Sequence, residues 1–211
     1  MLHQFGAYFI SPKGDFLMSM FTGIITHLGK VSKKTKRTLT IKTNQDLLSK
    51  ITEGTSVSVN GICLTVVNIN RDSFEIDFMP ETYTRTSIKY LQPDDPANLE
   101  LPATPASFLS GHIVQGHIDG TAKLAGNTEE KNNHILKFSI PNDLSRYIAE
   151  KGSIAINGIS LTVIEAEKNY FTVGIIPYTW NFTMLKTIKI GDFVNIETDI
   201  LAKYVERLTK K

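Results

Sequence analysis

The residues best suited to acid–base chemistry lie in the second half of the chain, which carries His117, Lys151, Ser160 and Asp199. A histidine transfers protons near neutral pH, and a carboxylate can orient that histidine or act as the base itself. The residue types therefore indicate proton transfer. The sequence alone does not show whether the four groups meet in space.

The single cysteine, Cys63, is a further candidate. A thiol has a pKa of about 8.5 and becomes a nucleophile only where its surroundings lower that value. Plain packing as a small apolar residue is the alternative interpretation. One cysteine also excludes an internal disulfide and favours a reducing compartment such as the cytoplasm.

These candidates belong to an internal repeat. The string NGICLTV at 60–66 returns as NGISLTV at 157–163, with Ser160 in place of Cys63. The same offset pairs other identical residues, among them Phe74 with Phe171, Pro80 with Pro177, Asn98 with Asn195 and Glu100 with Glu197. Such self-similarity predicts two homologous halves.

The halves share groups suited to recognition and differ in groups suited to catalysis. The shared turns and hydroxyls are Gly23 with Gly116, Ser56 with Ser153, Thr65 with Thr162, and Thr82 with Thr179. Together they suit an uncharged heterocycle with a polyol tail, because buried donors and acceptors must be matched. Ordinary turn and strand hydrogen bonding is the alternative for each one alone. The differing positions are Ile24 against His117, Gly54 against Lys151, Cys63 against Ser160, and Pro102 against Asp199.

The elements that must position these residues are mostly short strands. Alternating residues predict strands at 38–42, 56–59, 64–69 and 73–79, and again at 135–140, 153–156, 161–166 and 170–176. One short helix is expected in each half, beginning near Asn44 and Asn142, whose side chains can cap a helix. Many short strands with a single helix predict an all-β fold with one small barrel in each half.

Composition excludes several functional classes. The 211 residues are 41% hydrophobic and 21% charged, which is typical of a soluble globular protein. A net charge of +2 gives no basic surface for nucleic acid, and the basic run at 33–37 is interpreted as a solvated hairpin loop. The histidines form no pair with metal-ligand spacing, and no apolar run approaches the roughly 20 residues of a membrane span. We therefore expect no metal, no nucleic acid and no membrane.

The two ends lie outside the repeat. Residues 1–19 lack the features of a signal peptide and are interpreted as a loosely ordered leader, either an upstream start or an addition to the native chain. Near the other end, Leu201, Tyr204, Val205 and Leu208 share one face of an expected helix. That face is expected to pack either on neighbouring chains or on its own barrel. The expected domains are 20–110 and 111–200, followed by the helix at 201–211.

Four motifs in register resemble riboflavin synthase: MFTGII at 20–25, NGICLTV, GHIVQGHIDG at 111–120, and NGISLTV. The resemblance extends over 20–211. It implies two six-stranded Greek-key barrels, a C-terminal helix and a homotrimer. It also implies that each barrel binds one 6,7-dimethyl-8-ribityllumazine, with the active site between the N-terminal barrel of one subunit and the C-terminal barrel of another. Some similar proteins associate with a shell of lumazine synthase, and the sequence leaves this open.

The resemblance implies site residues as well. Positions that matter for rate in similar proteins correspond here to Phe21, Ser56, Cys63, His117, Ser160, Thr162 and Asp199. Ligand contacts in the first half correspond to Gly23, Ile24, Ile25, Cys63, Leu64, Thr65, Asp77, Phe78, Met79, Pro80, Glu81 and Thr82. Ligand contacts in the second half correspond to Gly116, His117, Ile118, Lys151, Ser160, Leu161, Thr162, Ile175, Ile176, Pro177, Tyr178, Thr179 and Trp180.

The implied reaction is a dismutation, the last step of riboflavin biosynthesis, catalysed by a transferase. One lumazine donates four carbons to another, which gives riboflavin and 5-amino-6-(D-ribitylamino)uracil. The methyl group on ring carbon 7 is acidic because its anion delocalises into the heterocycle. The substrate thus supplies the electron sink, and no cofactor is expected. Holding two substrates in opposed orientation can contribute about 7–11 kcal/mol.

We expect the residues of each half to act on the ligand of that half. His117 would transfer protons at the second-half ligand, with help from Ser160, Thr162 and Asp199. Cys63 and Ser56 would assist at the ligand of the first half.

Three other functional classes are alternatives to the enzyme. A lumazine-binding antenna protein shares the scaffold without turnover, but its second half tends to lose the repeat and its polar residues. Here both halves keep the Leu-Thr-Val motif, and His117, Ser160 and Asp199 are present, which favours the enzyme. A flavin reductase would need a glycine-rich nucleotide turn, and no G-x-G-x-x-G occurs. A nucleic-acid-binding barrel would need an aromatic and basic ladder.

Two features differ from the family pattern. Similar proteins begin at the residue that matches Met20, so the leader at 1–19 would lie close to the ligand and to Phe21. In the second half, Tyr178 and Trp180 replace Glu81 and Tyr83 of the first. These aromatic residues either alter ligand stacking or add bulk at the rim of the barrel.

Overall fold

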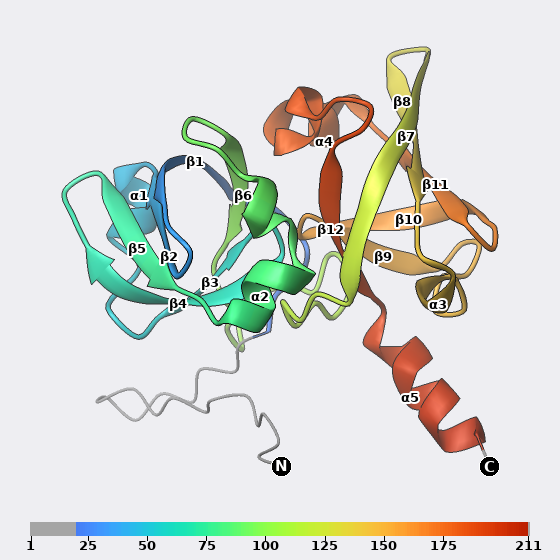
Figure 1. Ribbon diagram of the computed structural model, residues 1–211, viewed down its shortest axis with the longest axis horizontal. Helices are drawn as coiled ribbons and strands as arrows, with labels where there is room; N and C mark the ends of the chain where they lie inside the picture. The colour runs from blue at the N-terminus through green and yellow to red at the C-terminus, as the bar shows by residue number, and fades with distance from the viewer. Residues whose placement is uncertain (1–19, 211) are drawn as a thin grey trace.

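The structure consists of two closed antiparallel β-barrels that lie side by side (Figure 1). It is a computed structural model that describes residues 20–210, so the expected leader at 1–19 lies outside the described residues. Each barrel has six strands. The all-β fold expected from the sequence is therefore confirmed.

The first barrel shows the Greek-key connection. Its strands are β1 (His27–Lys34), β2 (Thr38–Lys42), β3 (Ser56–Val59), β4 (Ile62–Ile69), β5 (Ser73–Asp77) and β6 (Pro96–Glu100). They follow the order β1–β2–β5–β4–β3–β6, and β6 pairs with β1 to close the barrel. Three consecutive strands, β3 to β5, form a meander, and β2 returns beside β5, which defines a Greek key.

The second barrel repeats this order. Its strands are β7 (Gly120–Glu130), β8 (Asn133–Ser139), β9 (Ser153–Ile156), β10 (Ile159–Ala166), β11 (Tyr170–Ile175) and β12 (Phe193–Thr198). Reading from β7, the order is β7–β8–β11–β10–β9–β12. The irregularities repeat as well, because β4 shifts register against β5 where β10 shifts against β11. Such a bulge bends the strand and strengthens its twist, which helps a short sheet to close.

Alternation along each strand fills the barrels. In β2, Leu39 and Ile41 are buried, and Thr38, Thr40 and Lys42, which alternate with them, are not. Buried aliphatic side chains and phenylalanines from the other strands complete the two cores, with Phe74 in the first and Phe138 stacked on Phe171 in the second. Strands with one face inward and one outward leave every second residue free to line a surface site.

The short helices differ from the expectation of one in each half. The Asn44 side chain caps α1 (Gln45–Leu48) as expected, but α3 (Asn142–Ser145) has Pro141 at its cap and Asn142 as its first residue. Each half also has a helical turn after its fifth strand, where a proline with fixed φ begins α2 (Pro80–Arg85) and α4 (Pro177–Phe182). The 3₁₀-helices η1 (Ser87–Tyr90) and η2 (Met184–Thr187) follow.

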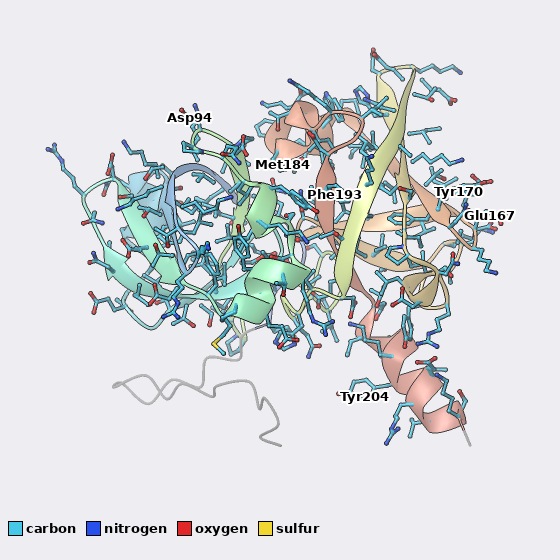
Figure 2. The ribbon with its side chains drawn as sticks, viewed as in Figure 1. Asp94, Glu167, Tyr170, Met184, Phe193 and Tyr204 are labelled. Carbon is cyan, nitrogen blue, oxygen red and sulfur yellow. The ribbon has the colours of Figure 1, made fainter. Side chains whose placement is uncertain are left out.

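Four asparagines of the repeat join the barrels. The Asn98 amide donates to the Asn157 carbonyl oxygen at 2.9 Å, and the Asn195 amide donates to the Asn60 carbonyl oxygen at 2.8 Å. Asn98 Oδ1 also accepts the Met184 N–H at 2.8 Å, where Met184 lies between the barrels (Figure 2). All of these asparagines are buried, and buried polar groups must be paired in this way. The network therefore fixes the barrels relative to each other.

The C-terminal helix α5 (Ile200–Thr209) extends away from both barrels (Figure 1). Its apolar residues Leu201, Tyr204, Val205 and Leu208 are 62%, 61%, 60% and 84% exposed, and Figure 2 shows Tyr204 clear of the barrels. The alternative that this face packs on its own barrel is therefore wrong. Within residues 20–210, no helix is both long enough and apolar enough to cross a membrane.

Candidate active site

Two segments between the barrels form the centre of the site, and a buried glutamate holds each of them. Glu100 accepts the Thr22 N–H and hydroxyl, both at 2.7 Å, and the Gly23 N–H at 3.1 Å. In the second half, Glu197 accepts the N–H groups of Gln115 at 2.7 Å and Gly116 at 2.9 Å. These are charge-assisted bonds to backbone donors. Each carboxylate therefore fixes the path of one segment.

Burial opposes the charge on both glutamates. Desolvation raises the pKa of Glu100, against the hydrogen bonds from Thr22 and Gly23. For Glu197 desolvation is the largest cause, and it raises the pKa from 4.5 to about 7, against the bonds from Gln115 and Gly116. The hydrogen bonds from Gln115 and Gly116 to Glu197 are thus sensitive to pH near neutrality.

The two segments cross, and each lies against the barrel of the other half. The Ser160 N–H on β10 donates to the Gly23 carbonyl oxygen at 2.8 Å, and the Cys63 N–H on β4 donates to the Gly116 carbonyl oxygen at 3.0 Å. Ile25 packs against the core of the second barrel, and Ile118 packs against the core of the first. Residues of both halves therefore build each candidate site.

Glycine is required at both crossings. Gly23 and Gly116 each have a φ of +77°, which L-residues rarely adopt. A Cβ at Gly23 would lie 2.6 Å from Ser160 Cβ, and a Cβ at Gly116 would lie 2.5 Å from Cys63 Cβ. The backbone at Gly23 and at Gly116 therefore lies too close to β10 and β4, respectively, to leave room for a side chain.

Each site is an outward-facing surface rather than a deep pocket. On β4, Thr65 is exposed and alternates with the buried Leu64 and Val66, and Thr162 is likewise exposed on β10. Continued by one residue, the pairing of Val66 with Ile76 brings Asp77 opposite Thr65. The first-barrel face (Cys63, Thr65 and Asp77) and the second-barrel face (Ser160, Thr162 and Gly174) are equivalent surfaces.

Sequence reasoning missed His112, which the structure places beside Ser160. Its Nδ1 atom is 2.7 Å from Ser160 Oγ, and the residue is only 8% exposed. Its Nε2 atom is buried with no partner among the described residues. Burial lowers the pKa of His112, and the nearby Asp199 carboxylate opposes this effect. The signal was present, because His112 is the second residue of the same GHIVQGHIDG motif that contains His117.

His117 lies elsewhere than expected. Its neighbours Gly116 and Ile118 contact the first barrel, so the segment that carries His117 belongs with Cys63. His112 takes the place beside Ser160 and Asp199 that was expected for His117. His117 is exposed, yet desolvation by the surrounding chain lowers its pKa. Lys203 on α5 lowers it further and Asp119 raises it.

The remaining predicted catalytic residues have clear structural positions. Phe21 is fully buried, packs with Val114, Ala155 and Cys63, and forms an isolated bridge with Val114. Phe21 therefore packs against residues of both halves next to the crossing segments. Ser56 on β3 is paired with Thr65 on β4, so its side chain lies on the same face of the sheet as Thr65.

Lys151 and Asp199 each have a structural reason to be singled out. Lys151 has a φ of +64° where the first half has Gly54 at +86°. A non-glycine residue in this region is strained, and such strain is concentrated at functional sites. Its N–H donates to the Val163 carbonyl oxygen at 2.9 Å, beside Thr162. Asp199 Oδ1 caps α5 by accepting the Leu201 N–H at 3.0 Å.

Helix α4 contacts a residue that lines a hollow next to the second-barrel face. Trp180 stacks on His134 of the β7–β8 hairpin, with ring centroids 3.6 Å apart, and Tyr178 contacts Phe182 at 4.6 Å. A cavity of about 740 Å³ lies between the hairpin and the ends of β10 and β11, and Ile176 forms part of its wall. Another hollow of about 420 Å³ is lined in part by Tyr90 and Phe193, whose rings stack on each other, and no sequence-predicted site residue lines it.

Comparisons with known proteins agree with this geometry. The lumazine binding domain matches twice, at residues 22–102 and 115–199. The chain is 42% identical to riboflavin synthase of Actinobacillus pleuropneumoniae over 196 residues, which is 91% of each protein. Identity to the Bacillus subtilis riboflavin synthase is 36% over 196 residues, again 91% of each.

Solved structures place the fold in the same class. LumP complexed with 6,7-dimethyl-8-(1'-D-ribityl) lumazine matches with a TM-score of 0.76 at 28% identity, over 84% of this chain and 98% of that one. LumP complexed with riboflavin matches with a TM-score of 0.78 at 29% identity over the same shares. Fold and crossing segments thus define a duplicated lumazine-binding protein. Within this class, the chain belongs to the riboflavin synthase family.

Proposed function

We propose that the protein is a riboflavin synthase, a transferase that converts two molecules of 6,7-dimethyl-8-ribityllumazine into riboflavin and 5-amino-6-(D-ribitylamino)uracil. The observation that carries this proposal is that both repeats are complete. Each has a glutamate-held segment that crosses to the opposite barrel and an outward face with a threonine. Two equivalent faces suit a reaction whose two substrates are the same molecule.

The first-barrel face offers the better position for proton removal. Desolvation and the Lys203 charge both favour the neutral imidazole of His117, and a neutral imidazole can accept a proton. The acidic proton of the substrate is on the methyl group of ring carbon 7, and its removal leaves an anion that the heterocycle stabilises. In this scheme His117 takes that proton, and the Cys63 and Thr65 side chains contact the ring.

The second-barrel face offers a polarised hydroxyl. Burial favours the neutral form of His112, whose Nδ1 lies 2.7 Å from Ser160 Oγ. In this scheme Ser160 and Thr162 hydrogen-bond the second lumazine, and the Lys151 ammonium group supplies a positive charge nearby. The protein's main contribution is to hold the two heterocycles face to face, an effect worth about 7–11 kcal/mol.

We further propose that the two faces that form one active site come from different subunits of a homotrimer. The exposed apolar stripe of α5 supports association with neighbouring chains, because an apolar helix face is normally covered. Both faces open outward on their barrels, which suits a partner surface opposite each of them. The cytoplasm, with its reducing conditions, is the proposed compartment.

Complementation between two inactive variants tests this arrangement. Gly116→Ala damages the first-barrel face, and Gly23→Ala damages the second-barrel face. Mixed trimers assembled from equal amounts of both variants should recover about one quarter of wild-type activity, because a site then needs one intact face from each of two chains. No recovery above the separate variants would contradict the proposal that the site spans two chains.

The competing function is lumazine binding without turnover. LumP shares the fold, so the fold alone does not separate the two functions. An enzyme consumes lumazine and forms riboflavin. A binding protein returns the lumazine unchanged after denaturation, and chromatography of the released ligand distinguishes the two.

A further inference from the structure

The segment that carries His117 (residues 115–119) is fixed at both of its ends. At the first end, Glu197 accepts the Gln115 and Gly116 N–H groups. At the second end, Asp119 Oδ2 accepts the Thr198 N–H at 2.8 Å and the Thr198 hydroxyl at 2.9 Å. His117 lies between these two anchors, so its position depends on both.

The second anchor continues into α5. Asp119 Oδ1 is 2.7 Å from Lys203 Nζ, and the two side chains are only 21% and 26% exposed. A partly buried ion pair is screened less by solvent than one on an open surface. Lys203 lies just after the Asp199 cap, on the helix whose apolar face is uncovered. The helix is therefore attached directly to the segment that carries His117.

The first half shows what the segment looks like without this attachment. There Glu100 holds the Thr22–Gly23 turn in the same way. The residue that corresponds to Asp119 is Thr26, and the chain continues from β6 into Leu101 and Pro102 without a helix. The ion pair is thus an addition to the second copy of the repeat, in which the segment carries a histidine instead of Ile24.

We propose that Lys203 is a positioning residue, which through Asp119 makes α5 part of the first-barrel site and sets the charge around His117. This inference rests on the proposed function, because that function assigns His117 to the site. The charged groups that act on His117 are Lys203 from α5 and Asp119 from its own segment. Glu197 on β12 and Cys63 on β4 hold the neighbouring Gly116.

The charge of Lys203 has two effects that act together. It lowers the pKa of His117, which favours the neutral imidazole. It also lowers the pKa of Glu197, which favours the carboxylate that holds the start of the same segment. One cation therefore keeps the histidine able to accept a proton and the segment attached. Packing of α5 against another chain would stabilise both the neutral state of His117 and the attachment of its segment.

The test is a pH titration of the His117 ring protons by NMR in the full-length protein. Lys203→Met removes the charge and keeps most of the aliphatic stem, and it should raise the titration midpoint of His117 by about 0.3–1 pH unit. Asp119→Asn should move the midpoint in the opposite direction, because it leaves Lys203 unneutralised. Lys203→Arg should stay close to wild type.

Lys210→Met is the matched control on the same helix. Lys210 pairs with Glu206 at 2.6 Å, so this variant also removes a cation and an ion pair from α5. The control should leave the His117 midpoint and the rate unchanged. Lys203→Met should lose about 2–10-fold in kcat/KM at pH 7, and the acid limb of its pH–rate profile should shift to higher pH. Sedimentation separates this effect from a change in assembly.

An unchanged His117 midpoint in Lys203→Met would overturn the inference, as would an equal shift in Lys210→Met. A rate loss that simply follows loss of the oligomer in both variants would also overturn it. The NMR titration needs no turnover. A wild-type protein that forms no riboflavin would thus refute the proposed function, while the titration would still decide the role of Lys203.

Discussion

Substitution of Gly116 by alanine tests the crossing of the segments most severely. The new Cβ would lie 2.5 Å from Cys63 Cβ and 2.6 Å from Cys63 N, whereas carbon atoms in contact are about 3.5–4.0 Å apart. The segment must therefore retreat by about 1 Å. It would then lose the hydrogen bond in which the Cys63 N–H donates to the Gly116 carbonyl oxygen.

The cost follows from two separate effects. A left-handed φ of +77° costs an L-residue roughly 1–2 kcal/mol. Loss of a buried backbone hydrogen bond costs about another 1–2 kcal/mol. A total of about 3 kcal/mol lowers the population in which the segment lies against β4 by a factor on the order of 100. We expect affinity for lumazine at the first-barrel face, and riboflavin formation, to fall by about that factor.

Gly126→Ala is the matched control. Its Cβ would lie 3.7 Å from Lys137 Cβ, an ordinary contact, on the hairpin of the second barrel. Lumazine fluorescence titration and riboflavin absorbance measure both variants, and circular dichroism confirms that the barrels remain folded. Wild-type affinity and turnover in Gly116→Ala would refute the claim that the segment from one half completes the site of the other.

Three further predictions concern stability and assembly. Asn98→Ala leaves the Met184 N–H and the Asn157 carbonyl oxygen unpaired between the barrels, so thermal unfolding should show a loss of about 2–4 kcal/mol. In the unfolded chain Glu197 titrates near 4.5 and in the folded protein near 7, so the folded state binds the proton more tightly. Stability should therefore fall as the pH rises from about 4.5 to 7, by up to about 3 kcal/mol, and denaturant titrations of Glu197→Gln should lack that part of the slope. Val205→Glu places a charge on the exposed stripe of α5 and should lower the mass in sedimentation while circular dichroism still shows folded barrels, whereas an unchanged mass would contradict a role of that stripe in assembly.

Local signals in the sequence were sufficient for the strands and for the duplication. Period-two alternation and the repeated Asn-Gly turns reflect backbone geometry within a few residues, so β4 and β10 could be predicted. The prediction that Asn142 caps a helix was wrong, because Pro141 takes the cap position and Asn142 is already the first residue of α3. The turns α2 and α4 were missed because six residues carry too little periodicity to predict a helix.

The arrangement of the site depends on contacts far apart in the chain. Nothing local indicates that the Gly116 segment lies on the first barrel or that the Gly23 segment lies on the second, since this follows from how the Asn98 and Asn195 contacts join the barrels. The same long-range arrangement puts His112, rather than His117, beside Ser160. Residue types were thus predictable, while their grouping was not.

The central claim is that two equivalent faces bring two lumazines together for reaction. The most direct measurement incubates the purified protein with 6,7-dimethyl-8-ribityllumazine and quantifies substrate and both products over time. Our account predicts that two lumazines disappear for each riboflavin and each 5-amino-6-(D-ribitylamino)uracil formed, over many turnovers. Lumazine that binds tightly and is recovered unchanged would contradict it.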